Sequence, residues 1–177
     1  MAAVIVEAFQ RLIPPAPGFL ETLREVTEET GVVLIFDELG TGFRFAYGGA
    51  QEYYGVVPDM CSLGKVVGGG YPLACVAGSD EIMAHFDASK VGEGAFLPQI
   101  GTLSGNPVAA AAGRATLRVL REPSAYDRLH AIGRKLMEGI TELLQKTGTK
   151  AQVVGEPPLF DVFFTEDDVG DYRTLTR

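Results

Sequence analysis

The sequence has few cysteines, little positive charge and no long hydrophobic run, and each absence argues against a class of protein. Cys61 and Cys75 are the only cysteines among 177 residues, and neither belongs to a CxxC or Cys/His pattern. They indicate reduced core thiols of a cytoplasmic protein rather than a disulfide framework or a metal site. The formal net charge of -8 disfavours nucleic acid and anionic membranes as partners, because both attract basic surfaces. No apolar run approaches the roughly 20 residues of a membrane span, and the N-terminus lacks the features of a signal peptide.

The composition is otherwise that of a folded protein. Hydrophobic residues make up 46% and charged residues 21% of the chain, which is typical of globular domains. A chain of 177 residues can bury roughly 70% of the surface that its unfolded form exposes, so a sizeable core is expected. Met1 opens almost directly onto a predicted strand, and Arg177 falls in a predicted helix start. We therefore interpret the chain as part of a longer protein.

Hydrophobic patterning predicts both strands and helices along the chain. The run at residues 32–36 has no polar alternation, which is typical of a strand covered on both faces of a parallel sheet. Other apolar runs predict a buried strand at residues 3–7, strands at 60–63 and 73–77, and a broken pair within 151–165. Helices are predicted at residues 19–30, 79–86, 106–120 and 124–147.

The predicted helices have recognisable ends and apolar faces. Gly31 and Gly148 are placed to end two of them, and Ser79 and Asn106 to cap the starts of two others. The first helix is expected to share one apolar face among Leu20, Leu23 and Val26. The buried stripe predicted for the last helix consists of Leu129, Ile132, Leu136, Ile140, Leu143 and Leu144.

This order of elements predicts an α/β fold with a mostly parallel sheet, flanking helices and a second subdomain that begins near Glu122. We accordingly divide the chain into a partial large domain, residues 1–121, and the start of a small C-terminal domain, residues 122–177.

Two acids, Asp37 and Glu38, end the most apolar predicted strand. In open α/β sheets the carboxyl ends of the strands face the ligand crevice, so a functional acid is expected there. Burying a carboxylate costs several kcal/mol unless a cation or hydrogen bonds satisfy it. A helix cap or a structural ion pair would satisfy the same pattern, so position alone does not separate the two interpretations.

The strand and its acids also resemble the second nucleotide motif of P-loop ATPases. That interpretation requires a glycine-rich phosphate loop, G-x-x-x-x-G-K-[ST]. Here Gly64 and Lys65 are followed by Val66, and Asp59 stands five positions before Gly64. The phosphate loop is therefore missing, and a nucleotide-hydrolysing domain rests on the strand pattern alone.

Lys65 lies at the end of the next predicted strand, beside the glycines at residues 68–70. Apolar neighbours such as Leu63 and Val66 would partly desolvate its amine and make it more nucleophilic. The glycines suggest a close approach between backbone and ligand. Most lysines are solvated surface groups, so Lys65 becomes a candidate only through its surroundings.

Residues 101–107, GTLSGNP, open a predicted helix. Helix N-termini bind anions through free N–H groups, and Thr102 and Ser104 would add hydroxyl donors, although an ordinary capped helix start has the same pattern. A strand-end acid, a desolvated lysine and an anion site together suit pyridoxal phosphate. Its aldehyde needs a lysine, its pyridine nitrogen an acid, and its phosphate an anion site.

With these residues in view, the sequence resembles the class III, fold-type I aminotransferases, especially the glutamate-1-semialdehyde aminomutase branch. The resemblance runs through nearly the whole chain. It is carried by residues 3–7, 36–38, 41–44, 48–51, 63–65, 68–70, 101–107, 153–155 and 163–165. The resemblance implies a fold-type I large domain that binds pyridoxal 5'-phosphate, followed by the start of an α+β small domain.

The resemblance also implies roles for individual residues. Lys65 would form a Schiff base with the cofactor and shuttle a proton, and Asp37 would keep the pyridine nitrogen protonated. Leu39 would pack against one face of the pyridine ring. Thr102 would reach the phosphate of the neighbouring subunit's cofactor, which implies a homodimer with shared active sites. The implied reaction transfers an amino group between a small amino compound and a keto or aldehyde acceptor, or within one molecule in the aminomutase alternative.

The chain departs from the family pattern in two positions and in length. Ala8 stands where the family usually has proline, and Gly40 where many members have a glutamine that helps to bind the cofactor. The chain covers less than half of the usual family length, without the main phosphate loop and the aromatic ring that stacks on the cofactor. A truncated, non-catalytic domain that associates with another chain is therefore a second hypothesis, since a partial sheet leaves edges and apolar surface exposed.

Overall fold

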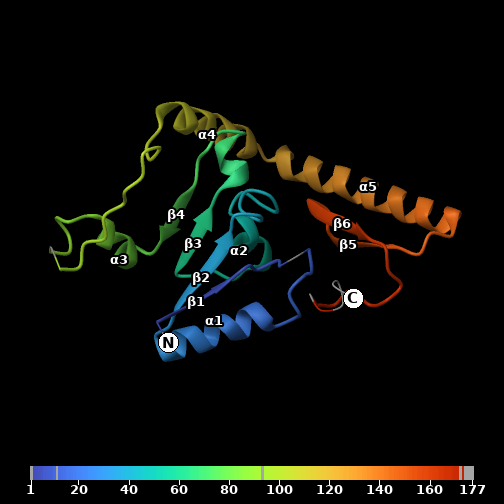
Figure 1. Ribbon diagram of the computed structural model, residues 1–177, viewed down its shortest axis with the longest axis horizontal. Coiled ribbons are helices and arrows are strands. Elements are labelled where there is room, and N and C mark those ends of the chain that lie inside the picture. The colour runs from blue at the N-terminus through green and yellow to red at the C-terminus, as the bar shows by residue number, and fades with distance from the viewer. Residues whose placement is uncertain (1, 11, 93, 172, 174–177) are drawn as a thin grey trace.

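The computed structural model describes residues 2–10, 12–92, 94–171 and 173. It contains a four-stranded sheet with flanking helices, and a long helix beside a two-stranded sheet (Figure 1). The strands are β1 (Ala3–Val6), β2 (Val33–Glu38), β3 (Met60–Leu63), β4 (Cys75–Gly78), β5 (Gln152–Glu156) and β6 (Leu159–Phe163). The helices are α1 (Phe19–Thr30), α2 (Gly49–Tyr54), η1 (Lys65–Gly68), α3 (Asp80–Met83), η2 (Ala84–Phe86), α4 (Pro107–Leu120) and α5 (Ser124–Thr147).

The larger sheet has the order β1-β2-β3-β4, in which the first three strands are parallel and β4 is antiparallel to β3. The predicted α/β fold with a mostly parallel sheet is thereby confirmed. The register between β2 and β3 pairs Asp37 with Ser62 and Glu38 with Leu63. Because side chains alternate along a strand, Asp37 and Ser62 share one face of the sheet, and Glu38 and Leu63 share the other.

Only one face of β2 is fully buried, so the prediction of a strand covered on both faces is wrong for the described residues. Leu34 and Phe36 are 0% exposed and belong to the core cluster, which also includes Leu20 of α1. The side chain of Ile35 points to the opposite face and is only half-buried. Its register partner in β1, Ile5, is 65% exposed. The segment at residues 3–7 therefore forms the predicted strand but not a buried one, because it lies at an edge of the sheet.

Helix α1 confirms the predicted helix but shows a different buried face. Leu20 is buried and Leu23 packs against the core. Val26 is 49% exposed, and Thr27 takes the inward position that was expected for Val26. The spacing 20, 23, 27 keeps closer to the 3.6-residue period than 20, 23, 26 does. Gly31 ends the helix in the left-handed conformation, with φ 65°, as predicted.

The two predicted helix caps behave differently. Asn106 caps α4, since its Oδ1 accepts hydrogen bonds from the Val108 and Ala109 amides at 3.0 and 3.1 Å. Ser79 precedes α3 without a side-chain cap bond, and the Met83 amide donates to its carbonyl instead. The predicted helix at residues 79–86 is therefore a short α-helix followed by the 3₁₀ turn η2.

Helix α5 has the predicted length and ends at Gly148, but its predicted buried stripe is wrong. Leu129, Ile132, Leu136 and Leu143 are between 39% and 60% exposed. The helix faces β5 and β6 with Gly133, where an added Cβ would lie 1.8 Å from the Pro157 carbonyl oxygen. Gly133 lets this helix approach the hairpin, and these four larger apolar residues remain on a surface that nothing in the described chain covers. The two strands predicted within residues 151–165 are confirmed as β5 and β6, which pair in antiparallel fashion to form a hairpin.

Polar contacts join α5 and the hairpin to the larger unit. Tyr126 donates a hydrogen bond to the Phe43 carbonyl at 3.2 Å, and His130 Nε2 lies 2.8 Å from the Phe45 carbonyl. Tyr53 of α2 donates to Glu156 of β5 at 3.0 Å. The division at residues 121 and 122 falls between α4 and α5 and stays a prediction.

Both cysteines are free, but only Cys61 is buried, so the expectation of two core thiols is wrong for Cys75. Cys75 lies in β4, where all four residues are exposed. None of the described helices is long and apolar enough to cross a membrane.

Candidate active site

The carboxyl ends of β2 and β3 lie side by side and bring the predicted site residues together. Asp37 and Ser62 are register partners, and the Ser62 hydroxyl donates a hydrogen bond to Asp37 Oδ1 at 2.9 Å. The Leu39 amide donates to the same oxygen at 3.0 Å. This second bond closes a turn of the kind that aspartate side chains form with the backbone two residues on. Asp37 is therefore held at the strand end, half-buried, by one donor from the loop after β2 and one from β3.

Lys65 lies two residues after the end of β3 and begins the 3₁₀ turn η1. Gly64, the residue between them, is buried, and an added Cβ there would lie 2.6 Å from Leu39 Cδ2. The loop after β2 and the turn after β3 therefore come into close contact, which a larger residue at Gly64 would prevent. Lys65 itself has a φ of 50°, in the left-handed region that residues with a side chain seldom adopt. Backbone strain of this kind occurs often at functional sites.

The expected desolvation of Lys65 is not found in this chain, where the residue is exposed. Val67 is buried at 4% exposure, because η1 packs its valine against α4 and turns the lysine outward. The lysine is therefore accessible to a ligand.

Glu38 has a structural environment, in contrast to Asp37. Its side chain is 0% exposed and accepts hydrogen bonds from Thr41 Oγ1 at 2.8 Å and from the Ala50 amide at 2.7 Å. The Gln51 amide and side-chain amide both donate to Glu38 Oε1 at 3.1 Å. Since Ala50 and Gln51 lie in the first turn of α2, the carboxylate caps the positive end of that helix. The capping interpretation of the two acids is therefore right for Glu38.

Thr102 lies in the long connection between η2 and the start of α4, outside the two strand ends that carry Asp37 and Lys65 (Figure 1). It is exposed, and the Ser104 amide closes a turn onto the Gly101 carbonyl at 3.0 Å. Asn106 already occupies the first amides of α4, so the expectation of free helix N–H groups for an anion is wrong here. The start of α4 is therefore an ordinary capped helix start. That the exposed Thr102 binds an anion stays a prediction.

The positions that depart from the family pattern fit the fold. Ala8 is buried at 2% exposure in the core. An added Cβ at Gly40 would meet nothing within 4 Å, so the fold does not require glycine there. The contact that a glutamine at position 40 would make with the cofactor is therefore absent, and Gly40 causes no backbone strain there.

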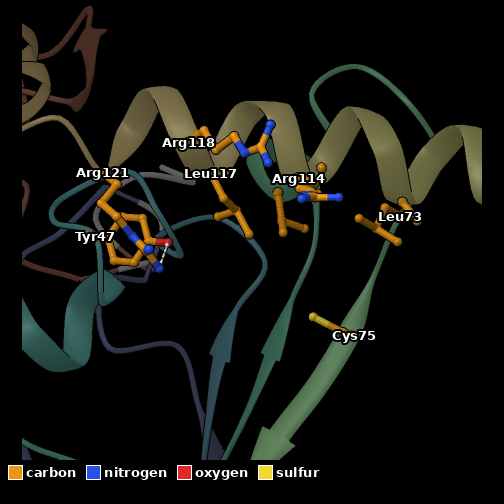
Figure 2. Close-up of a pocket in the computed structure, with 10 residues that line it drawn as sticks. Tyr47, Leu73, Cys75, Arg114, Leu117, Arg118 and Arg121 are labelled. Carbon is orange, nitrogen blue, oxygen red and sulfur yellow. Dashed lines mark hydrogen bonds between the residues drawn. The ribbon is translucent and has the colours of Figure 1, made fainter.

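A cavity of about 520 Å³, which the sequence did not predict, lies beneath α4 (Figure 2). Its lining includes Tyr47, Leu73 and Cys75, together with arginines of α4. Arg121 lies 5.5 Å from the centre of the Tyr47 ring and 3.4 Å from its hydroxyl. Cys75 pairs with Leu63, which pairs with Glu38, so this cavity opens on the Glu38 face of the sheet. It is therefore separate from the site that Asp37 faces.

Comparisons with known proteins show the family of the chain. The family pattern described as Aminotransferase class-III matches residues 1–171. The chain belongs to this class III aminotransferase family. Among similar proteins, glutamate-1-semialdehyde 2,1-aminomutase 2 of Brevibacillus brevis is 46% identical over 177 residues, which cover 98% of this chain and 40% of the relative. The glutamate-1-semialdehyde 2,1-aminomutase of Natranaerobius thermophilus is 42% identical over 99% of this chain and 40% of its own length.

Solved structures from the same family have the same fold. An omega-transaminase from Sphaerobacter thermophilus superimposes with a TM-score of 0.89 at 40% identity, over 97% of this chain and 39% of that one. A glutamate-1-semialdehyde-aminomutase from Pseudomonas aeruginosa in complex with PMP gives 0.76 at 28% identity, over 95% and 39%. The chain thus spans about 40% of the length of the relatives that it matches. Membership of this family does not support the alternative of a nucleotide-hydrolysing domain.

Proposed function

We propose that the chain carries the cofactor-anchoring part of a pyridoxal-phosphate-dependent enzyme that transfers an amino group to a keto or aldehyde acceptor. The observation that carries the proposal is the close approach of Gly64 to Leu39, which brings Lys65, Leu39 and Asp37 to one edge of the sheet. A lysine, an apolar side chain and a carboxylate are the groups that the aldehyde, the ring face and the pyridine nitrogen of this cofactor need. The residues present therefore fit the cofactor.

Each side chain has a separate task in the proposed site. The bound cofactor would supply an electron sink for the carbanion that forms when the substrate loses a proton. Lys65 Nζ would anchor the cofactor covalently and carry a proton to and from the reacting carbon atoms. Asp37 would hold a proton on the pyridine nitrogen through a charge-assisted hydrogen bond. Leu39, at 36% exposure, would offer an apolar surface to the ring and exclude water from it.

The covalent anchor is testable on the chain itself. The wild-type chain should give a visible absorbance band with pyridoxal phosphate, and borohydride reduction should fix the added mass on the peptide that contains Lys65. The Lys65→Ala variant should lose the band and the adduct. Lys90→Ala, which removes another exposed lysine, serves as the matched control and should keep both. A Lys65→Ala chain that forms the same reducible adduct would refute the assignment.

The described residues support transamination and intramolecular amino transfer equally, because both reactions use the same lysine and the same acid. We propose a small amino donor and a keto or aldehyde acceptor as substrates. Incubation with an amino donor alone distinguishes the two: a transaminase releases a keto product, whereas an aminomutase returns an isomer of its substrate.

We further propose that the complete enzyme is a cytoplasmic homodimer in which Thr102 contacts the cofactor phosphate of the neighbouring subunit. The support is the position of Thr102, which is exposed in the long connection that leads to α4 (Figure 1). Mixing a Lys65→Ala chain with a Thr102→Val chain tests the sharing. Shared sites predict that the mixture regains one intact site per dimer, which a cofactor titration detects.

The exposed stripe on α5 favours a second candidate function, association with another polypeptide. Leu136 is 51% and Leu143 60% exposed, and Ile132 and Ile140 continue the stripe along a shallow apolar groove. Exposed apolar patches of this kind often mark interaction surfaces. Sedimentation should show a concentration-dependent assembly that Leu136→Lys reduces. A compact monomer at all concentrations would contradict an obligatory association.

A further inference from the structure

Among the described residues, Ser62 is the one side chain that donates a hydrogen bond to Asp37, and it does so from β3. The hydroxyl donates to Asp37 Oδ1 at 2.9 Å, and the β2–β3 register places the two residues directly opposite one another. The Leu39 amide donates to the same oxygen at 3.0 Å. Among the residues that the structure describes, no hydrogen bond reaches Asp37 Oδ2.

This arrangement determines which carboxylate oxygen is free. A carboxylate held by a single donor can still rotate about its last torsion, which is broad and weakly restricted. Two donors from different directions, one from its own strand end and one from β3, hold Oδ1 in place. Oδ2 is then left as the oxygen that can accept from a ligand.

We propose that Ser62 is a positioning residue that orients the Asp37 carboxylate, so that Oδ2 meets the protonated pyridine nitrogen of the cofactor. The inference rests on the proposed function, because it assumes that Asp37 faces that nitrogen. A small hydroxyl side chain is needed at position 62. Serine or threonine can reach Oδ1 from β3, whereas alanine and valine supply no donor.

The structure also separates this role from simple packing. Ser62 is half-buried, and it points to the open face of the sheet, away from the cluster around Phe36 and Cys61. Its removal should therefore disturb the carboxylate more than the core. The Leu39 amide remains in a Ser62→Ala chain, so the expected effect is partial.

The test compares Ser62→Ala and Ser62→Thr with the wild-type chain in a titration with pyridoxal phosphate. A hydrogen bond to a charged group corresponds to a change of about tenfold or more in an equilibrium constant. Ser62→Ala should therefore bind the cofactor about tenfold more weakly, and Ser62→Thr should restore the affinity. Ser79→Ala, which removes an exposed serine that makes no side-chain cap bond, is the control and should leave the affinity unchanged.

A spectroscopic measurement separates positioning from stability. With ¹⁵N-labelled pyridoxal phosphate, the chemical shift of the pyridine nitrogen reports its protonation directly. A less well oriented carboxylate stabilises the protonated ring less, so the nitrogen should lose its proton at lower pH in Ser62→Ala. Ser62→Thr should return this midpoint to the wild-type value, and the urea midpoint of unfolding should differ little among the three chains.

The outcomes separate the two levels of the proposal. If the wild-type and Ser62→Ala chains bind the cofactor with the same affinity and the pyridine nitrogen has the same protonation midpoint in both, the role of Ser62 is overturned. The proposed function is not affected by that result. A weaker affinity in Ser62→Ala that Ser62→Thr does not restore also overturns the role of Ser62. A wild-type chain that forms no Lys65 adduct overturns the proposed function for this chain, and the role of Ser62 with it.

Discussion

Asp37 and Glu38 are consecutive in β2, yet their carboxylates lie on opposite faces of the sheet and have different kinds of partner. Glu38 is fully buried and accepts four hydrogen bonds from the loop and helix that follow it. Asp37 is half-buried and keeps one oxygen without a hydrogen bond among the described residues. The alternation of a β-strand thus assigns one acid to folding and leaves the other for chemistry.

This separation predicts opposite results for the two conservative amide substitutions. Glu38→Gln should lower the free energy of unfolding by about 2–4 kcal/mol, because the new amide group faces buried donors that then lack an acceptor. Asp37→Asn should change it by less than about 1 kcal/mol, since the site is open. Urea unfolding measures both. Equal losses in the two variants would contradict the assignment of Glu38 as the structural acid.

The backbone at Lys65 predicts a conflict between stability and function. With φ 50°, Lys65 adopts a conformation that glycine tolerates better than any residue with a Cβ. Lys65→Gly should therefore stabilise the chain by about 0.5–1 kcal/mol while it removes the cofactor anchor. Lys65→Ala, which keeps the strained backbone, is the matched control and should not be stabilised. Thermal unfolding of the cofactor-free variants distinguishes the two.

Two glycines within α5 make a matched pair. An added Cβ at Gly133 would lie 1.8 Å from the Pro157 carbonyl oxygen, whereas at Gly139 it would meet nothing within 4 Å. Gly139→Ala should stabilise the chain by about 0.5–1 kcal/mol through helix propensity. Gly133→Ala should destabilise it, because α5 and the β5–β6 hairpin must separate. If both variants gain stability, the hairpin does not pack on α5 as described.

Buried tyrosines predict a loss of stability in alkali. Burial raises the pKa of Tyr54, with smaller contributions from Glu156 and Tyr53. Burial also raises the pKa of Tyr126 to about 12. Since these folded-state values exceed the ordinary value of about 10, the unfolded chain loses its phenol protons first. Their contribution to stability is therefore complete below about pH 10 and declines as the pH rises from there.

The Tyr54→Phe variant isolates one of these groups. Its hydroxyl is buried and has no hydrogen-bond partner among the described residues, so its removal should leave stability at pH 7 unchanged or slightly higher. The fall in stability between pH 10 and 12 should become shallower. Tyr71→Phe, which removes a hydroxyl from a 52% exposed residue, is the control in the same urea titrations. An unchanged slope in Tyr54→Phe would contradict the prediction.

Most of the fold was predictable from local signals in the sequence. Gly31, Asn106 and Gly148 mark helix ends by backbone chemistry, and the structure confirms each of them. The predictions that concerned burial were less successful. The leucines of α5 and the second face of β2 were expected to be covered, but apolar patterning shows which face seeks contact and not what supplies it.

The candidate site was predictable in its residues but not in their connections. Asp37, Leu39 and Lys65 follow from the position of strand ends and from the family resemblance. The Ser62 bond depends on the register between β2 and β3, which a single sequence does not specify. The sequence showed only that Ser62 stands in a predicted strand, three residues before Lys65. The division of labour between Asp37 and Glu38 needed the same three-dimensional information.

The four bonds to Glu38 also have a kinetic consequence. Their donors all lie within 13 residues after the acid, so this network closes without any distant part of the chain. Contacts between residues close in sequence form early, because little chain entropy is lost in closing the loop. Within the segment from β2 to α2, Ala50 and Gln51 should therefore acquire protection from amide exchange during refolding before the amides that join β1 to β2, whose register partners lie 30 residues apart. Pulse-labelled hydrogen exchange measures that order, and simultaneous protection of both sets of amides would show that the segment does not fold first.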